Sequence, residues 1–271
     1  INILEKMVYE AANNGADYVK IQAIRSSELT YRAKFDTGID EKTGQKCIVR
    51  TFKSEKDRLS KLDLNLDEEK YFVDLCKKVG IKSMVTLFTW SGLYESINLG
   101  YDAIKVASYD CASFRFIKEI KKYWDKIFVS TGATYEHEIE KTVNILEGSD
   151  YHLLHCVTIY PTKLNQLHLS RMEQLRKYNE NIGFSDHTKP YETGLIASKL
   201  AIWLGASCIE RHFTILDENL TKDGPVSINP HQLNELSEFG GYDKLKQKEI
   251  IEDEFPSWQA SLGNPDRKLS T

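Results

Sequence analysis

The sequence has 271 residues, 41% of them hydrophobic, and a formal net charge of -4, which is enough apolar material for one domain of barrel size. The small negative charge excludes a global nucleic-acid or membrane-surface footprint, and no apolar run approaches the roughly 20 residues that span a bilayer. Five scattered cysteines without a Cys-x-x-Cys pair, and a start without a basic stretch followed by an apolar one, favour a reduced cytoplasmic protein.

Short apolar runs alternate along the chain with amphipathic stretches. The runs are apolar on both faces, as buried parallel strands are, and the stretches between them have helical periodicity. The predicted strands are residues 18–22, 83–88, 103–108, 127–131, 152–157, 182–186 and 208–213. The clearest predicted helices are residues 3–12, 67–79, 134–146 and 190–204.

This alternation predicts a parallel α/β sheet. Because a helix precedes the first of seven visible strands, we interpret the chain as a (β/α)8 TIM barrel whose first strand is missing. An open doubly wound sheet is the alternative, but no glycine-rich nucleotide turn follows any strand. We assign residues 1–241 to the barrel domain and residues 242–271 to a C-terminal tail.

Residues 25–61 form a long charged insertion after the first visible strand, with Tyr31, Phe35 and Phe52 spaced through it. One interpretation is a solvated loop. The other is a lid, because the active sites of barrels lie under the loops at the carboxyl ends of the strands.

The carboxyl ends of the predicted strands are polar, which would be costly to desolvate without a ligand. Any single residue there has an ordinary explanation as a turn cap or a core histidine, so the hypothesis of a site depends on the whole ring. Its members are Lys20, Gln22, Thr86, Lys105, Ser108, Asp110, Ser130, Thr131, His155, Thr158, Tyr160, Ser185, Asp186, His187, Glu210 and His212.

Two kinds of ligand suit this ring. Lys20 and Lys105 lie beside hydroxyls and amides, a composition that suits phosphate and carboxylate oxygens. His187 and His212 end adjacent strands, so their imidazoles can share one divalent ion. Two histidines do not specify zinc, and an open site completed by water and substrate suits Mn²⁺ or Mg²⁺.

Several motifs, in order, resemble the barrel of the sialic acid synthase (NeuB-type) family. They are GADYVKIQ at 15–22, IKVAS at 104–108, VSTG at 129–132, LHCVTIYPT at 154–162, GFSDHT at 183–188, IERHFT at 209–214 and DGPVS at 223–227. The resemblance implies condensation of phosphoenolpyruvate with an N-acylated amino sugar such as N-acetylmannosamine. The products are a nine-carbon 2-keto-3-deoxy sugar acid and phosphate.

The resemblance also implies roles for individual residues. His187 and His212 match the ligands of a Mn²⁺ or Mg²⁺ ion, and Asp110, Lys105 and His187 match catalytic positions. The positions that hold phosphoenolpyruvate or the sugar are matched by Lys20, Gln22, Thr86, Lys105, Ser108, Ser130, Thr158, Tyr160 and Ser185. Members of the family often dimerise, so a homo-oligomer is expected.

The chain departs from the family pattern in four places. Tyr109-Asp110 stands where the family has Gly-Glu, and Thr158 stands where many members have Asn. The motif of the first strand and the C-terminal antifreeze-like domain are both missing from this sequence. Two other functions remain open: a Schiff-base aldolase that uses Lys105 or Lys20, and a sugar-binding barrel without catalysis.

Overall fold

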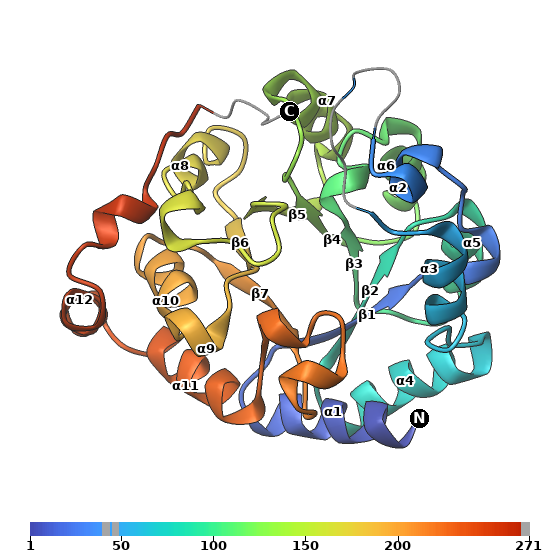
Figure 1. The fold of residues 1–271 in the computed structure, drawn as a ribbon, viewed down its shortest axis with the longest axis horizontal. Helices are drawn as coiled ribbons and strands as arrows, with labels where there is room; N and C mark the ends of the chain where they lie inside the picture. Colours follow the sequence, from blue (N-terminus) through green and yellow to red (C-terminus); the bar gives the residue numbers. More distant parts are fainter. Residues whose placement is uncertain (40–43, 45–48, 267–271) are drawn as a thin grey trace.

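The computed structural model describes residues 1–39, 44 and 49–266, and its centre is one curled sheet of parallel strands in chain order (Figure 1). The strands are β1 Tyr18–Ala23, β2 Lys82–Leu87, β3 Ala103–Val106, β4 Lys126–Ser130, β5 Asp150–Cys156, β6 Ile182–Asp186, β7 Cys208–Phe213 and β8 Ser227–Ile228. The helices are α1 Asn2–Asn13, α2 Ala33–Thr37, α3 Phe52–Leu59, α4 Leu66–Val79, α5 Trp90–Ser96, α6 Phe114–Ile120, α7 Glu136–Leu146, α8 Arg171–Leu175, α9 Pro190–Thr193, α10 Ile196–Trp203, α11 Pro230–Gly240 and α12 Lys244–Glu254. None of these helices is long and apolar enough to cross a membrane.

The α/β class and the parallel sheet are confirmed, and the seven predicted strands correspond to β1–β7. An eighth strand, β8, was not predicted. It has only two residues and pairs with the end of β7 through His212 and Phe213. The missing first strand stays a prediction, since it concerns residues outside this sequence.

Local signals in the sequence explain where α4 begins and ends. The Asn65 side chain accepts a hydrogen bond from the Glu68 backbone N–H at 3.0 Å, and the Glu68 carboxylate accepts one from the Asn65 N–H at 2.9 Å. Gly80 ends the helix at a φ of 86°, a conformation that other residues rarely adopt. The predicted helix 190–204 was wrong in one respect: Gly194 takes a φ of 58° and divides it into α9 and α10.

The seam between β8 and β1 is covered by a helix rather than by strand pairing. In the described part of the chain, β1 and β8 are the two ends of the hydrogen-bonded order. Helix α1 packs against both α4 and α11 on the outside of this seam (Figure 1). The turn after α1 contacts α11 so closely that a Cβ on Gly15 would lie 2.2 Å from the Ser237 hydroxyl. The helical layer therefore joins the first and last strands.

The predicted tail packs against the helical layer. Helix α12 lies beside α10 (Figure 1), and Lys199 of α10 forms ion pairs with Glu254 at 2.6 Å and Glu235 at 2.8 Å. Beyond α12, the Trp258 ring meets Trp203 edge to face at 5.0 Å. The division at residue 241 stays a prediction, although these contacts tie the tail to the barrel.

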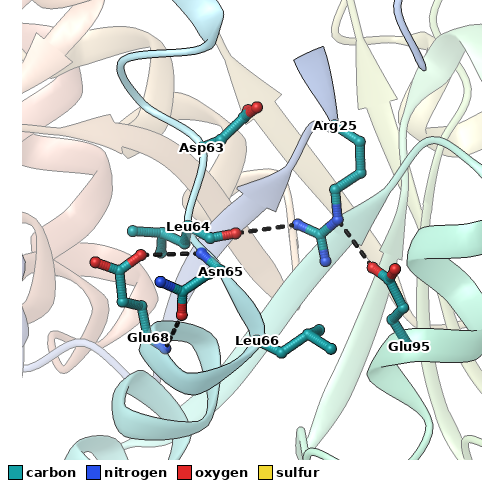
Figure 2. Close-up of a pocket in the computed structure, with 7 residues that line it drawn as sticks. All are labelled: Arg25, Asp63, Leu64, Asn65, Leu66, Glu68 and Glu95. Atoms are coloured by element: carbon teal, nitrogen blue, oxygen red, sulfur yellow. Dashed lines mark hydrogen bonds and ion pairs between the residues drawn. The ribbon is translucent and has the colours of Figure 1, made fainter. Parts of the chain in front are cut away.

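A cavity of about 350 Å³ lies outside the strand ring, between the end of β1 and helices α4 and α5. Figure 2 shows the Arg25 side chain extending across it, with Nε 3.0 Å from Glu95 and Nη1 3.5 Å from the Leu64 carbonyl. The same Nη1 forms an ion pair at 2.5 Å with Glu69, whose side chain has no exposed surface. Tyr101 donates a second hydrogen bond to Glu69 at 3.0 Å. This set of contacts fixes the start of the 25–61 segment, so we interpret the cavity as structural.

Arg25→Met should therefore destabilise the protein. The substitution leaves the buried Glu69 carboxylate without its cation, which costs on the order of 3 kcal/mol. Urea unfolding of wild type and variant measures this loss. Lys248→Met removes a half-exposed ion pair with Glu252 on α12, and its cost should stay under about 1 kcal/mol. Equal losses in the two variants would show that Glu69 does not depend on Arg25.

Candidate active site

The interior of the barrel has an apolar floor and a polar layer above it. Four buried residues form the floor, with Tyr18 and Cys208 packed against them: Met84, Ala103, Phe128 and Leu154. Because side chains two apart on a strand share a face, the residue two positions after each floor residue also points inward, nearer the carboxyl end. The inward positions above the floor are Lys20, Thr86, Lys105, Ser130, Cys156 and Glu210. Gly183 belongs to the floor, where a Cβ would lie 2.4 Å from both Cys208 Sγ and the Leu154 side chain.

Glu210 is the centre of the polar layer. Its carboxylate lies 2.8 Å from Lys105 Nζ and 3.4 Å from Lys20 Nζ. Ser185 donates a hydrogen bond to it at 2.7 Å, and Lys20 donates another to Thr86 at 3.0 Å. Lys20 of β1, Lys105 of β3 and Ser185 of β6 thus meet on one residue of β7, and Thr86 of β2 contacts Lys20. Four predicted substrate-binding residues are thus brought together.

Burial and charge act in opposite directions on this cluster. Burial alone would raise the pKa of Glu210, but the charges of Lys105 and Lys20 hold that pKa well below its usual range. Burial lowers the pKa of Lys20, and the Glu210 charge opposes that shift. The cluster therefore holds one carboxylate between two ammonium groups, with the cations in excess by one.

Two histidines and a tyrosine form a second cluster at the ends of β5, β6 and β7. The His187 and His212 ring centroids are 5.7 Å apart, and the Tyr160 ring lies 4.0 Å from His187 and 6.2 Å from His212. Burial, and then the charge of His212, lower the pKa of His187 to about 4. Burial also lowers the pKa of His212, although the nearby carboxylate of Asp223 opposes it. Both imidazoles are therefore neutral at pH 7.

The two histidines fit an open divalent-metal site. His187 Nδ1 lies 3.2 Å from the Val157 carbonyl, a contact that places the proton on Nδ1 and leaves the Nε2 lone pair free. Within the described ranges no group of three or more His, Cys, Asp or Glu side chains could hold a metal ion. Any ion at His187 and His212 would therefore take its other ligands from water and substrate.

A buried ion pair on the outer face of the sheet fixes the ends of β6 and β7. Asp186 and Arg211 are register partners, and their side chains meet at 2.7 Å with almost no exposed surface. The Asp186 carboxylate also accepts hydrogen bonds from Ser198 at 2.5 Å and from the Thr188 N–H at 2.8 Å. In the chain, Asp186 lies between Ser185 and His187, and Arg211 lies between Glu210 and His212. The ion pair therefore holds both histidines in place.

Ser108 and Thr158 lie together beside Gly132. Ser108 accepts a hydrogen bond from the Gly132 N–H at 3.1 Å, and a Cβ on Gly132 would lie 2.7 Å from the Thr158 methyl group. Ser130 is buried, and its hydroxyl has no hydrogen-bond partner among the described residues. Gln22 is exposed and is the register partner of Thr86. Among the described residues, none of these side chains forms a hydrogen bond or ion pair with Glu210.

Among the described residues, Asp110 forms no hydrogen bond or ion pair with the Glu210 cluster. It belongs to a short 3-10 turn after β3, and its carboxylate accepts a hydrogen bond from Ser113 at 3.0 Å. Burial raises its pKa, while Ser113 and the nearby Arg32 lower it. Arg32 lies 4.9 Å from the centre of the exposed Tyr109 ring. The predicted acid is thus linked to the 25–61 segment.

The 25–61 segment contacts loops on two sides of the barrel mouth. Arg32 lies over Tyr109 after β3, and Glu55 of α3 forms an ion pair at 2.6 Å with Lys222 in the loop between β7 and β8. Arg50 is close enough to Tyr160 for its charge to lower the pKa of that phenol, although burial has the larger and opposite effect. Residues 40–43 and 45–48, including Cys47, lie outside the described residues. The described contacts favour the lid interpretation over a freely solvated loop.

Glu210 belongs to the predicted polar ring, but neither the ring nor the family resemblance predicts a particular role for it. An acid on the inward face of its strand, at the height of two inward-facing lysines, was the signal that could have identified it. His155, in contrast, lies outside the site: its Nε2 is 2.7 Å from the Leu167 carbonyl, and its ring stacks on Phe184 at 5.8 Å. For His155 the ordinary explanation as a core histidine is correct.

Fold and site together define a class of protein, a curled parallel α/β barrel that holds a lysine cluster and a histidine pair at its strand ends. The NeuB family profile matches residues 7–240, and the chain belongs to the NeuB family. The resemblance to sialic acid synthases is thereby confirmed.

Several named proteins are similar in sequence to most of this chain. It is 31% identical to the N,N'-diacetyllegionaminic acid synthase of Campylobacter jejuni, across 87% of this chain and 70% of that protein. It is 25% identical to the pseudaminic acid synthase of Helicobacter pylori, across 84% of this chain and 66% of that protein. The chain thus spans about two thirds of the length of these relatives.

A solved structure shares the fold. The N-acetylneuraminic acid synthetase of Leptospira borgpetersenii, in complex with citrate, matches 94% of this chain and 87% of its own with a TM-score of 0.74. Its sequence identity is 24%, so the match supports the TIM-barrel architecture alone.

The ion pair between α3 and the β7–β8 loop should depend on pH. Burial alone would raise the pKa of Glu55, but Arg58 and Lys222 lower it from 4.5 to about 2. Because this pKa is lower in the folded state, the stabilisation is present above pH 4.5 and is lost as the pH falls towards 2. Glu55→Gln should therefore lower the free energy of unfolding by about 1 kcal/mol at pH 7, and by less at pH 3.

Urea unfolding of wild type and Glu55→Gln at the two pH values checks this expectation. Glu252→Gln, on the exposed face of α12, serves as the control and should change stability less at pH 7. If Glu55→Gln lowers the free energy of unfolding by the same amount at pH 7 and pH 3, the assigned ion pair is contradicted.

Proposed function

We propose that this protein condenses phosphoenolpyruvate with an N-acylated amino sugar of the N-acetylmannosamine type and releases inorganic phosphate. The product would be a nine-carbon 2-keto-3-deoxy sugar acid. The convergence of Lys20, Lys105 and Ser185 on one partly buried carboxylate carries the proposal, because these donors suit the oxygens of phosphate and carboxylate. Membership of the NeuB family supports it.

The lysine cluster would bind phosphoenolpyruvate. Lys20 and Lys105 would neutralise its phosphate and carboxylate, and Thr86 and Ser185 already contact these lysines or their carboxylate partner. Gln22, Ser108 and Ser130 would complete the anion side. The buried Ser130 hydroxyl has no partner within the described residues, so it is free to bond a ligand.

The proposed reaction forms one carbon–carbon bond. The methylene carbon of phosphoenolpyruvate attacks the aldehyde carbon of the open-chain sugar, and the aldehyde oxygen takes up a proton to become a hydroxyl. One water is consumed as phosphate leaves and the central carbon becomes a ketone. The protein's task is to hold two polar reactants in register while it neutralises the anionic one.

His187 and His212 would hold a Mn²⁺ or Mg²⁺ ion, which would polarise the aldehyde oxygen when bound. The chain's own contribution is to keep both imidazoles neutral through burial. The Val157 carbonyl fixes the tautomer of His187. Tyr160 packs against both histidines on this side of the site, where the sugar would bind, and Thr158 would contribute to the same sugar side.

Asp110 would hold and move a proton near the new hydroxyl. Burial raises the pKa of its carboxyl, which favours the protonated form that a general acid needs. A homo-oligomeric state and a cytoplasmic location remain predictions from the sequence.

One observation keeps the Schiff-base aldolase as a second candidate. Burial lowers the pKa of Lys20, as in lysines that act as nucleophiles. The contact of both lysines with Glu210 opposes this role, because a paired ammonium group lacks the free lone pair. Reduction with borohydride in the presence of pyruvate would trap a covalent adduct only for the aldolase.

The proposed reaction predicts phosphate release from phosphoenolpyruvate that requires both an amino sugar and Mn²⁺. Lys105→Met should lower kcat/KM about 100-fold, because a charge-assisted contact to the substrate is lost. Chelation with EDTA should stop the reaction, and added Mn²⁺ should restore it.

Lys126→Met is the matched control, since Lys126 pairs with Asp150 at the opposite end of the barrel. It should keep nearly full activity. The absence of phosphate release across mannosamine-type and diacetamido sugars would refute the proposed reaction.

Asp110→Asn should separate catalysis from binding. An amide cannot transfer the proton, so kcat should fall about 100-fold while the KM for phosphoenolpyruvate changes little. Steady-state kinetics would measure both constants. Asp125→Asn, an exposed change before β4, is the control. An unchanged kcat would leave Asp110 with only a structural role.

A further inference from the structure

The Glu210 carboxylate occupies the point on which the donors of the anion site converge. Lys105 Nζ lies 2.8 Å from it, Lys20 Nζ lies 3.4 Å from it and Ser185 donates to it at 2.7 Å. Carboxylate and phosphate oxygens accept the same hydrogen bonds from ammonium and hydroxyl groups. In this arrangement, the protein's own acid takes the contacts that a bound phosphate would need.

The two anions cannot use these donors independently. The Lys105 side chain is only 6% exposed and the Lys20 side chain 19% exposed, so water can satisfy few of their N–H groups. A phosphate that enters the cluster must draw the ammonium groups away from Glu210 or share them with it. Sharing places two negative groups side by side in a buried site, which is unfavourable.

The charges of the cluster show how Glu210 affects the binding of phosphate. Lys20 and Lys105 contribute two positive charges and Glu210 removes one, so the cluster presents one net positive charge to an incoming anion. Two lysines alone would hold a dianionic phosphate more tightly. Glu210 therefore weakens phosphate binding while it keeps the empty site stable, because the lysines are never without a counter-ion.

From this geometry we infer that Glu210 is an internal competitor that displaces inorganic phosphate from Lys20 and Lys105 after the reaction. The inference rests on the proposed function, in which phosphate is a product formed in the site. The Glu210 side chain is 22% exposed, so its carboxylate stays in contact with solvent while it pairs with the two lysines. Glu210 is thus a positioning residue for the lysines and a release device for the product.

The test is calorimetric titration of wild type and Glu210→Gln with inorganic phosphate and with phosphoenolpyruvate. The amide keeps the size of Glu210 but removes its charge and replaces one acceptor oxygen with an NH2 donor. We expect Glu210→Gln to bind phosphate at least about tenfold more tightly, since one repulsive charge close to the ligand is lost. In steady-state kinetics the inhibition constant of phosphate should fall by a similar factor, and kcat should fall because phosphate leaves slowly.

Glu254→Gln is the matched control. Glu254 also forms an ion pair with a buried lysine, Lys199, but this pair lies between α10 and α12 outside the barrel. The control loses the same charge from the protein and should bind phosphate as wild type does. A similar gain in both variants would overturn the inference, because the effect would then come from overall charge.

The remaining outcomes separate the inference from the proposed function. If wild type binds neither phosphate nor phosphoenolpyruvate, the proposed function fails. If wild type binds them and Glu210→Gln binds them equally or more weakly, Glu210 only orients the lysines and the inference fails.

A structure of the wild-type protein with bound phosphoenolpyruvate tests the inference even if Glu210→Gln does not fold. The distance between Lys105 Nζ and Glu210 should then exceed its present 2.8 Å and pass beyond hydrogen-bonding range. An ion pair that stays intact beside the bound ligand would overturn the inference.

Discussion

The ion pair between Glu210 and two lysines is the constraint around which the interior of this barrel is built. An ammonium group buried above an apolar floor is costly unless an anion lies beside it. Lys105 of β3 is almost fully buried, and its partner Glu210 lies on β7, four strands away in the sheet. The strand register that places Glu210 of β7 at the level of Lys105 of β3 therefore also assembles the anion site.

The outer face of the same strands carries the complementary constraint. Alternation along β6 places Ser185 and His187 inside and Asp186 outside, and along β7 it places Glu210 and His212 inside and Arg211 outside. The Asp186–Arg211 pair thus fixes the two strands from behind. A shift of one residue in either strand would exchange the two faces and remove both clusters together.

How far the sequence predicts this molecule depends on the range of each signal. The strands β1–β7 follow from apolar runs, and the ends of α4 follow from Asn65 and Gly80, because these signals act over a few residues. The two-residue β8 is too short to show periodicity. The inward direction of Lys20, Lys105 and Glu210 follows from strand alternation, but their meeting on one carboxylate depends on the curl of the sheet. His155 was included in the predicted ring because it lies near the end of a strand. Its side chain instead points into the helical layer, where it contacts the Leu167 carbonyl.

Asp110 shows how a change in the family pattern is accommodated across the fold. With Tyr109-Asp110 in place of Gly-Glu, the acid is one methylene shorter and a ring stands beside it. The Arg32 guanidinium lies 4.9 Å from the centre of this ring, in a segment that Glu55 also ties to Lys222 on the other side of the mouth. Arg32 opposes the rise that burial causes in the pKa of Asp110. The contact with Tyr109 thus holds the Arg32 guanidinium near Asp110. Without Arg32, only burial and the Ser113 hydrogen bond would set the pKa of Asp110. The protonation of this acid therefore depends on the 25–61 segment.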